Sequence, residues 1–295
     1  MKASEKVIEK IILISAIVTT VSVALITVFI FKTGLPVLAD YGVLEFITGT
    51  EWRPTNGSFG ILPLIAGTLY VTFGALLIGV PTGIACAVLL SEIASKKLAG
   101  PFKAAIELLA GIPSVVYGFF GLIVLVPAIR NYVLPVFQQF NPEMNTSGFS
   151  VLAGAVILSI MILPTIVSLS ENAISAVPKE FREASLALGA NKMETIMKVT
   201  LPAAKSGIFS SIILAMGRAI GETMAVLLIT GNVAQMPGSI LDPVATLTGT
   251  IAMEMSYASP THQQALFAIG IILFILIMIL NILAQTVMKK LGGEN

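Results

Sequence analysis

The sequence contains few charged residues, one cysteine and one histidine. Charged residues account for 11% of its 295 residues, hydrophobic residues account for 56%, and the mean hydropathy is +0.96. Soluble domains average about 25% charged residues, so this composition indicates an integral membrane protein. The single Cys86 excludes a disulfide within the chain, and no further metal ligands cluster around the single His262 in the sequence. The net charge of +1 gives no reason to expect a nucleic-acid partner.

A further absence concerns ATP. No Gly-x-x-x-x-Gly-Lys-Ser/Thr string occurs anywhere in the chain, so the loop with which many ATPases cradle phosphate is missing. We therefore expect that this chain is not an enzyme and binds no cofactor or metal of its own. If ATP and Mg²⁺ are used, a separate chain must hold them.

Six apolar runs are each long enough to cross a bilayer as an α-helix, which needs about 20 residues. They are Ile11–Phe31, Leu64–Leu90, Ala104–Pro127, Phe149–Leu169, Ile208–Thr230 and Ala265–Val287. The first run could be taken for a signal peptide, but Lys32 follows it directly and no small-residue cleavage site ends it. We therefore predict an all-α integral membrane protein with six transmembrane helices embedded in lipid, and expect the first helix to be retained.

The basic residues of the connecting segments predict the orientation of these spans. With the N-terminus in the cytoplasm, thirteen Lys and Arg residues fall on the cytoplasmic side and three on the outer side. The thirteen are Lys2, Lys6, Lys10, Lys96, Lys97, Lys103, Lys179, Arg182, Lys192, Lys198, Lys205, Lys289 and Lys290. The three are Lys32, Arg53 and Arg130. We therefore expect a multi-pass protein of the cell membrane with both termini in the cytoplasm.

Three polar segments fall on the outer side of this topology, namely Gly34–Pro63, Arg130–Gly148 and Gly231–Gln264. They are either solvated linkers or a platform for an external partner. Within the third, the portion Thr246–Met255 is rich in Met, Ala and Thr and is expected to form a short interfacial or re-entrant helix.

The segment 178–202 is a charged interruption between the fourth and fifth apolar runs. Pro178 suits the first turn of a helix, and Gly189 suits the left-handed residue just past its end. Between them, apolar and small residues recur at helical spacing and share one face, which contains Phe181, Ala184, Ser185 and Leu188. A helix of about ten residues is marginal in water, so this face must pack either against a partner protein or against the chain's own membrane surface.

The fifth apolar run carries two ionisable residues, Arg218 and Glu222, and two glycines, Gly217 and Gly221. The four-residue spacing places the arginine and the glutamate on one helical face, within reach of each other. One interpretation is a self-neutralising pair beside glycines that pack against a neighbouring helix. The other is a path for an oxyanion, since arginine binds such ions with two parallel hydrogen bonds. A carboxylate there would accept a hydrogen bond from phosphate, which still carries a proton at neutral pH, but would repel sulfate.

The segment 178–202 resembles the Glu-Ala-Ala loop of ABC-importer permeases, in which Gly follows after three residues and Ile-x-Leu-Pro after nine more. Glu183, Ala184 and Gly189 match, while Ser185 replaces the second Ala and Val199 replaces Ile. The resemblance implies that this loop docks into a groove of a separate ATPase. The residues it assigns to coupling are Phe181, Glu183, Ala184, Ser185, Leu188, Gly189, Leu201 and Pro202.

Three further motifs, Gly79–Ile84 with Ser91-Glu92, Gly111–Gly118 and Gly217–Thr223, resemble permeases of phosphate-specific transport systems. The likeness extends from Leu64 to Lys290, and the additional N-terminal span is more similar to the C-type than to the A-type permease. The resemblance implies a type I ABC-importer permease fold, with a core over 64–290 preceded by a helix and outer loop over 1–63.

The same resemblance implies partners and site residues. The partners would be an A-type permease, a dimer of ATP-binding subunits and an external phosphate-binding protein. Arg218 and Glu222 would act on the transported anion. Hydroxyls of Ser114 and Thr223 would line the path, unless they serve only helix packing.

Two alternatives remain open from the sequence. The chain could be an ABC-importer permease for another solute, such as molybdate or sulfate, although the Arg218/Glu222 segment argues against this. It could instead be a secondary carrier, with Glu222 relaying protons, but carriers often contain paired broken helices and no clear pair is evident. A role in reporting transport status to regulators is not addressed by the sequence.

Overall fold

The computed structural model describes residues 3–140 and 147–292. Lys2, together with Asn141, Pro142 and Asn145 of the second outer segment, lies outside the described residues. Within the described ranges, six helices are long and apolar enough to cross a membrane, as predicted. They are Ile8–Tyr41, Leu62–Ile93, Ser114–Gln138, Val151–Ser175, Lys192–Gly221 and Pro260–Val287.

The elements fall in the two described ranges. Those in 3–140 are α1 (Ala3–Tyr41), α2 (Val43–Thr48), β1 (Trp52–Arg53), η1 (Pro54–Asn56), β2 (Ser58–Phe59), α3 (Leu62–Val88), η2 (Leu89–Ile93), α4 (Lys96–Ala110), α5 (Ser114–Phe120), η3 (Gly121–Leu125), α6 (Val126–Ala128), η4 (Ile129–Val133) and α7 (Leu134–Gln138). Those in 147–292 are α8 (Val151–Ser175), α9 (Lys179–Ala187), α10 (Lys192–Thr195), η5 (Ile196–Thr200), α11 (Leu201–Gly221), α12 (Met224–Ile229), α13 (Leu247–Glu254) and α14 (Pro260–Gly292). The segments η2 to η5 are π-helical, and β1 pairs antiparallel with β2.

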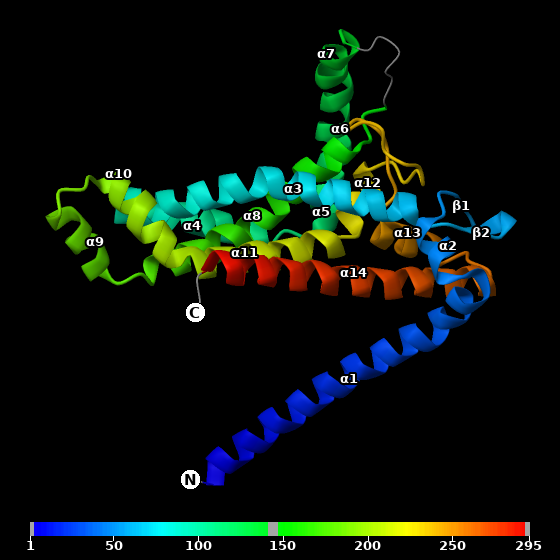
Figure 1. The fold of residues 1–295 in the computed structure, drawn as a ribbon, viewed down its shortest axis with the longest axis horizontal. Coiled ribbons are helices and arrows are strands. Elements are labelled where there is room, and N and C mark those ends of the chain that lie inside the picture. The colour runs from blue at the N-terminus through cyan, green and yellow to red at the C-terminus, as the bar shows by residue number, and fades with distance from the viewer. Residues whose placement is uncertain (1–2, 141–146, 293–295) are drawn as a thin grey trace.

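The centre of the molecule is a bundle in which α3 packs along α8 and α8 packs along α11, with α14 beside them (Figure 1). Gly79 and Gly83 of the motif in the second span permit the close contact of α3 with α8. A Cβ atom at Gly83 would lie 2.6 Å from Cγ2 of Ile166, which is too close for any side chain. A buried hydrogen bond of 2.9 Å between the hydroxyls of Ser170 and Ser211 joins α8 to α11.

Two of the six predicted spans are broken, which corrects their predicted bounds. The run Ala104–Pro127 is divided at Gly111–Pro113, because Pro113 adopts an extended backbone and α5 starts only after it. The run Ile208–Thr230 is divided at Glu222, which is also extended, and the short helix α12 follows. The third and fifth spans are therefore both interrupted, although no clear pair of broken helices is evident in the sequence. By contrast, α3 continues through Pro81 without interruption.

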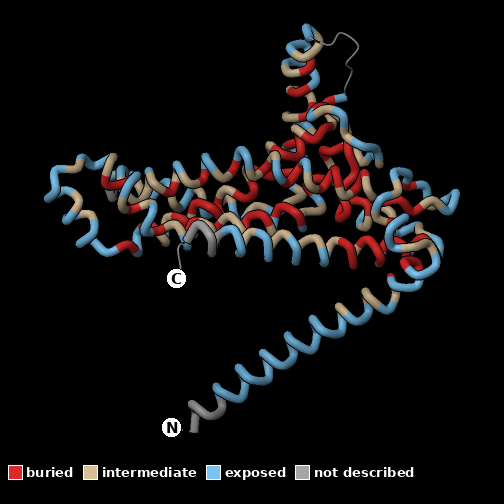
Figure 2. The backbone as a smooth tube through the Cα atoms, viewed as in Figure 1, coloured by how far each residue is buried: buried red, intermediate tan, exposed pale blue. Residues whose placement is uncertain are grey.

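The first and second outer segments contain more helix than the sequence indicates. Helix α1 runs through Gly34 to Tyr41, and the third span extends through Arg130 to Gln138. The apolar residues of α1 are exposed over most of its length (Figure 2). The C-terminal turns of α1 pack on α14, whereas its N-terminal part extends away from the bundle (Figure 1). This exposure suits a helix surrounded by lipid.

The end of the bundle that carries α13 is covered by packed loops and not by free linkers. The expected helix in the third outer segment is confirmed as α13, and Trp52 of β1 donates from Nε1 to the carboxylate of Glu254 at 3.1 and 3.2 Å. Nε2 of the buried His262 lies 2.7 Å from the same carboxylate. His262 thus has a partner that the sequence did not indicate, and the described residues contain no cluster able to hold a metal ion.

Candidate functional site

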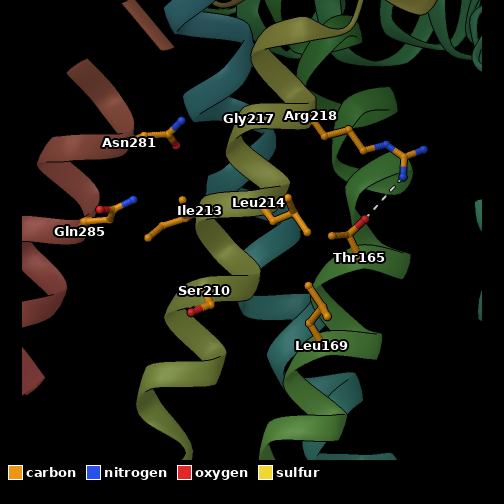
Figure 3. Close-up of a pocket in the computed structure, with 9 residues that line it drawn as sticks. All are labelled: Thr165, Leu169, Ser210, Ile213, Leu214, Gly217, Arg218, Asn281 and Gln285. Atoms are coloured by element: carbon orange, nitrogen blue, oxygen red, sulfur yellow. Dashed lines mark hydrogen bonds between the residues drawn. The ribbon is translucent and has the colours of Figure 1, made fainter. Parts of the chain in front are cut away.

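A groove of about 810 Å³ runs along α11 between α8 and α14 (Figure 3). We call it the Arg218 groove, because Arg218 is its only charged lining residue. It is lined by Thr165, Leu169, Ser210, Ile213, Leu214, Gly217, Arg218, Asn281 and Gln285. The wall therefore combines apolar side chains with hydroxyl and carboxamide groups at several levels of the membrane-spanning helices.

Arg218 itself is held loosely. Its guanidinium extends from α11 toward α8, where Nη1 donates to Oγ1 of Thr165 at 3.4 Å (Figure 3), a distance beyond the usual range of such bonds. None of the ion pairs found among the described residues includes Arg218, and the residue is exposed. A guanidinium inside an apolar span is costly unless water, an anion or another chain solvates it.

The predicted contact between Arg218 and Glu222 is absent from the described structure. Helix α11 ends at Gly221, and the extended backbone of Glu222 turns its side chain away from the helical face. Oε1 of Glu222 instead accepts from the backbone N–H of Ala225 at 3.2 Å, in the first turn of α12. Because the four-residue rule holds only inside a continuous helix, the break removes the pair.

Among the described residues, the two glycines of this motif do not pack against a neighbouring helix. A Cβ atom at Gly217 or Gly221 would meet no other atom within 4 Å. The space in front of α11 is therefore open, and it can admit a solute or a helix of another subunit.

The two helix breaks lie next to each other. Helix α5, which begins at Ser114, packs against α12 so closely that a Cβ atom at Gly118 would be 3.1 Å from Cα of Ala225. At the break in the fifth span, Thr223 Oγ1 donates to the carbonyl of Gly221 at 3.1 Å. At the break in the third span, the Tyr117 hydroxyl donates to the carbonyl of Leu109 at 2.8 Å. Hydroxyls thus satisfy backbone groups that the breaks release.

Four polar residues of the Arg218 groove, namely Thr165, Ser210, Asn281 and Gln285, are not among the residues predicted from the sequence. Asn281 and Gln285 are four residues apart on α14, and both carboxamides point toward α11 in Figure 3. A search for uncharged polar residues inside the apolar runs, at helical spacing, would have found this pair.

The second candidate region is the helix predicted from Pro178 to Gly189. It is confirmed as the nine-residue helix α9, which directly follows Pro178, and Gly189 has the expected left-handed backbone with φ +88°. A depression of about 580 Å³ borders this helix, and we call it the α9 depression. It is lined by Phe181, Ala184, Ser185, Leu188, Gly189, Ala190, Glu194, Lys198 and Val199.

The α9 depression presents apolar side chains to the outside. Phe181 is 53% exposed and Leu188 is 89% exposed, and no residue of the fully described helix α9 is buried. Glu183 is exposed beside the depression. Leu201 and Pro202 are placed differently, because they begin α11 and join this hairpin to the fifth span instead of lining the depression.

Comparison with known proteins extends this description. Residues 79–292 match the family described as "Binding-protein-dependent transport system inner membrane component". The chain is 41% identical to the "Probable ABC transporter permease protein YqgH" of Bacillus subtilis, over 85% of this chain and 80% of that protein. It is 34% identical to the "Phosphate transport system permease protein PstC" of Mesorhizobium japonicum, over 95% of this chain and 88% of that protein.

Solved structures show the same fold. A bacterial ABC transporter involved in the import of the polysaccharide alginate aligns with a TM-score of 0.62 at 14% identity, covering 98% of this chain and 99% of the other. An inward-facing MetNI methionine ABC transporter aligns with a TM-score of 0.56 at 21% identity, covering 79% and 94%. These likenesses place the six helices in the type I fold of ABC-importer permeases, as predicted.

Proposed function

This chain belongs to the family of binding-protein-dependent transport system inner membrane components, and from that premise we propose that it is the C-type permease subunit of an ATP-driven phosphate importer. As a member of this family it is a multi-pass inner-membrane protein that works with an ATPase and further subunits. Phosphate is proposed as the solute because the PstC relatives that cover most of the chain are named as phosphate transport permeases.

The proposal rests mainly on Arg218, which lies on the wall of a groove within the membrane-spanning helices. The hydrogen-bond donors of its guanidinium are largely unsatisfied. Its one hydrogen bond is long, and its planar fork matches two oxygens of a phosphate ion. Leu214, next to it on α11, is 58% exposed, so one side of the groove is uncovered in this chain. We propose that an A-type permease covers that side and completes the path.

The roles of the residues at the helix breaks change with the structure. Glu222 holds the first turn of α12 through Ala225, so we propose that it fixes the break next to the path instead of pairing with Arg218. Ser114 and Thr223 lie at the starts of α5 and α12, and we propose that their hydroxyls border the path. Discrimination between phosphate and sulfate then depends mainly on the surroundings of Arg218.

Coupling to ATP is proposed to occur through α9. Its exposed Phe181 and Leu188 need a partner surface, and we propose that they insert into an ATP-binding subunit, which holds ATP and Mg²⁺. This chain would then bind no cofactor and catalyse no hydrolysis. With α9 and both termini in the cytoplasm, a phosphate-binding protein would dock on the opposite, outer end.

The test is ATP-dependent uptake of labelled phosphate into vesicles that contain this chain with its partner permease, ATPase and binding protein. We expect uptake that arsenate inhibits and sulfate does not. Arg218→Ala should abolish it, whereas Arg130→Ala, in the third span outside the groove, should not. Preferred uptake of sulfate or molybdate would overturn the substrate, and ATP-independent uptake by this chain alone would overturn the transporter class.

A further inference from the structure

Arg182 of α9 connects the coupling helix to the cytoplasmic ends of two spans. Its Nη2 and Nε lie 2.7 and 2.9 Å from Oε1 of Glu92, which belongs to the π-helical segment η2 at the end of the second span. Nη2 also donates to the carbonyl of Ile174 at 2.8 Å, and Nη1 donates to that of Val177 at 2.6 Å. One guanidinium therefore holds α9, η2 and the end of α8 together.

The remaining contacts of α9 with the bundle are sparse. The helix has no buried residue, and its large apolar side chains point outward. Arg182 is the exception among its charged residues, since its side chain is 20% exposed and that of Glu92 is 11% exposed. A second side-chain contact is the 2.9 Å hydrogen bond between the hydroxyls of Ser185 and Thr195. It joins α9 to α10, which continues into the fifth span. Apart from the short backbone link of residues 176–178 to α8, Arg182 provides the side-chain contacts through which a displacement of α9 can reach the second and fourth spans.

The chemistry of this junction requires arginine. The planar guanidinium carries five N–H donors in a fixed fork, and here it contacts a carboxylate and two carbonyls in different directions. The carbonyls of Ile174 and Val177 lie at the C-terminal end of α8, where unsatisfied acceptors and the negative end of the helix dipole favour a cation. A lysine could keep the contact with Glu92 but could not reach all of these acceptors at once.

A displacement at this junction can be transmitted to the Arg218 groove through the packing of α3 and α8. Helix α3 packs along α8 through Gly79 and Gly83, and α8 carries Thr165, the hydrogen-bond partner of Arg218. We propose that Arg182 is a positioning residue for energy coupling, which transmits movement of the ATPase-docked α9 through Glu92 and the end of α8 to the walls of the groove. This inference rests on the proposed docking of α9 to an ATPase.

The test uses the complete transporter in vesicles and measures phosphate uptake per ATP hydrolysed, with and without the binding protein. The main variant is Arg182→Met with Glu92→Leu, because removing both charges leaves no buried charge without a partner. We expect ATPase capture and basal hydrolysis to persist while uptake per ATP falls about tenfold to a hundredfold, as displaced functional groups commonly cause. Arg182→Lys with native Glu92 should restore part of the ratio.

The matched control is the ion pair between Lys103 of α4 and Glu171 of α8, which is also 2.7 Å long but does not involve α9. Lys103→Met with Glu171→Leu should keep the wild-type ratio. A wild-type ratio in the Arg182/Glu92 variant would overturn the inference, and so would loss of ATPase capture, which would make the pair a requirement for docking. Absence of ATP-driven uptake in the wild-type complex would instead refute the proposed function.

Discussion

The Arg218 groove and the α9 depression differ in the kind of side chain that they expose, but both expose side chains that lack a partner. In the groove, an exposed cation lies among apolar side chains of membrane-spanning helices. In the depression, exposed apolar side chains lie on a charged hairpin outside the bundle. Each surface is unfavourable in its own surroundings, so each indicates a missing partner: an anion and a covering subunit for the first, and a protein groove for the second.

The two arginines of these regions show the same contrast. Arg182 makes four short hydrogen bonds and is largely enclosed, whereas Arg218 makes one bond of 3.4 Å and is exposed. A guanidinium with satisfied donors fixes the arrangement of its own chain, and one with free donors is available to a ligand. The number and quality of its hydrogen bonds, more than residue type, therefore separates a positioning arginine from a candidate binding arginine.

The largest expected effect comes from removing the cation of the groove. Arg218→Ala should lower phosphate uptake at least about thirtyfold, because losing a partner of a desolvated charge pair costs about 2–5 kcal/mol. Capture of the ATPase by the detergent-solubilised complex should stay at the wild-type level, since α9 is remote in sequence and structure. Weaker capture would mean that the two regions are not independent.

The converse experiment alters the α9 depression. Leu188→Asp should weaken capture of the ATPase by at least about tenfold, because burying a leucine contributes about 1.5–3 kcal/mol. Transport is lost as a consequence, while thermal unfolding of the isolated permease should not change, because Leu188 is 89% exposed. Leu186→Asp is the control, since Leu186 is exposed on the same helix but does not line the depression. Equal loss in both variants would count against docking through this face.

The sequence predicted the coupling region well because its signals are local. The proline before α9, the spacing of its apolar residues and the left-handed Gly189 all act within one short helix and its ends. The partner of Arg182 could not be found in this way, because Glu92 is 90 residues away in the chain. Only packing of the second span along the fourth brings η2 to the end of α8.

The groove was predicted less well for a related reason. Arg218 was identified from its charge in an apolar run, but its supposed partner was inferred from the spacing of an unbroken helix. The break at Glu222 has a weaker local signal, since Gly221 precedes it but neither neighbour is a proline. The break at Pro113 has the stronger signal, yet hydropathy alone joined Ala104–Ala110 of α4 to the third span.

A smaller effect is expected from backbone strain at Gly189. A valine there should reduce uptake several-fold to about tenfold, because a left-handed conformation costs an L-residue about 1–2 kcal/mol. Gly57 is a matched control in the outer hairpin, with φ +76° and, like Gly189, open space around a new Cβ atom. Gly57→Val involves the same strain, so its unfolding temperature should fall by a similar amount while uptake per ATP stays normal. Similar transport defects would point to general destabilisation.

The smallest effect is expected from removing the hydrogen bond between Ser185 and Thr195, which is the second side-chain contact that holds α9. Ser185→Ala removes the 2.9 Å hydrogen bond to Thr195, which contributes about 0.5–1.5 kcal/mol, and restores the Ala found in the motif that this loop resembles. Uptake per ATP should change by less than about twofold, because Arg182 still joins α9 to two spans. Combining Ser185→Ala with Arg182→Met and Glu92→Leu should then lower the ratio below that of the Arg182/Glu92 variant, since neither link remains. If Ser185→Ala alone uncouples as strongly as that variant, the movement of α9 passes mainly through Thr195 to the fifth span, and the guanidinium junction is secondary.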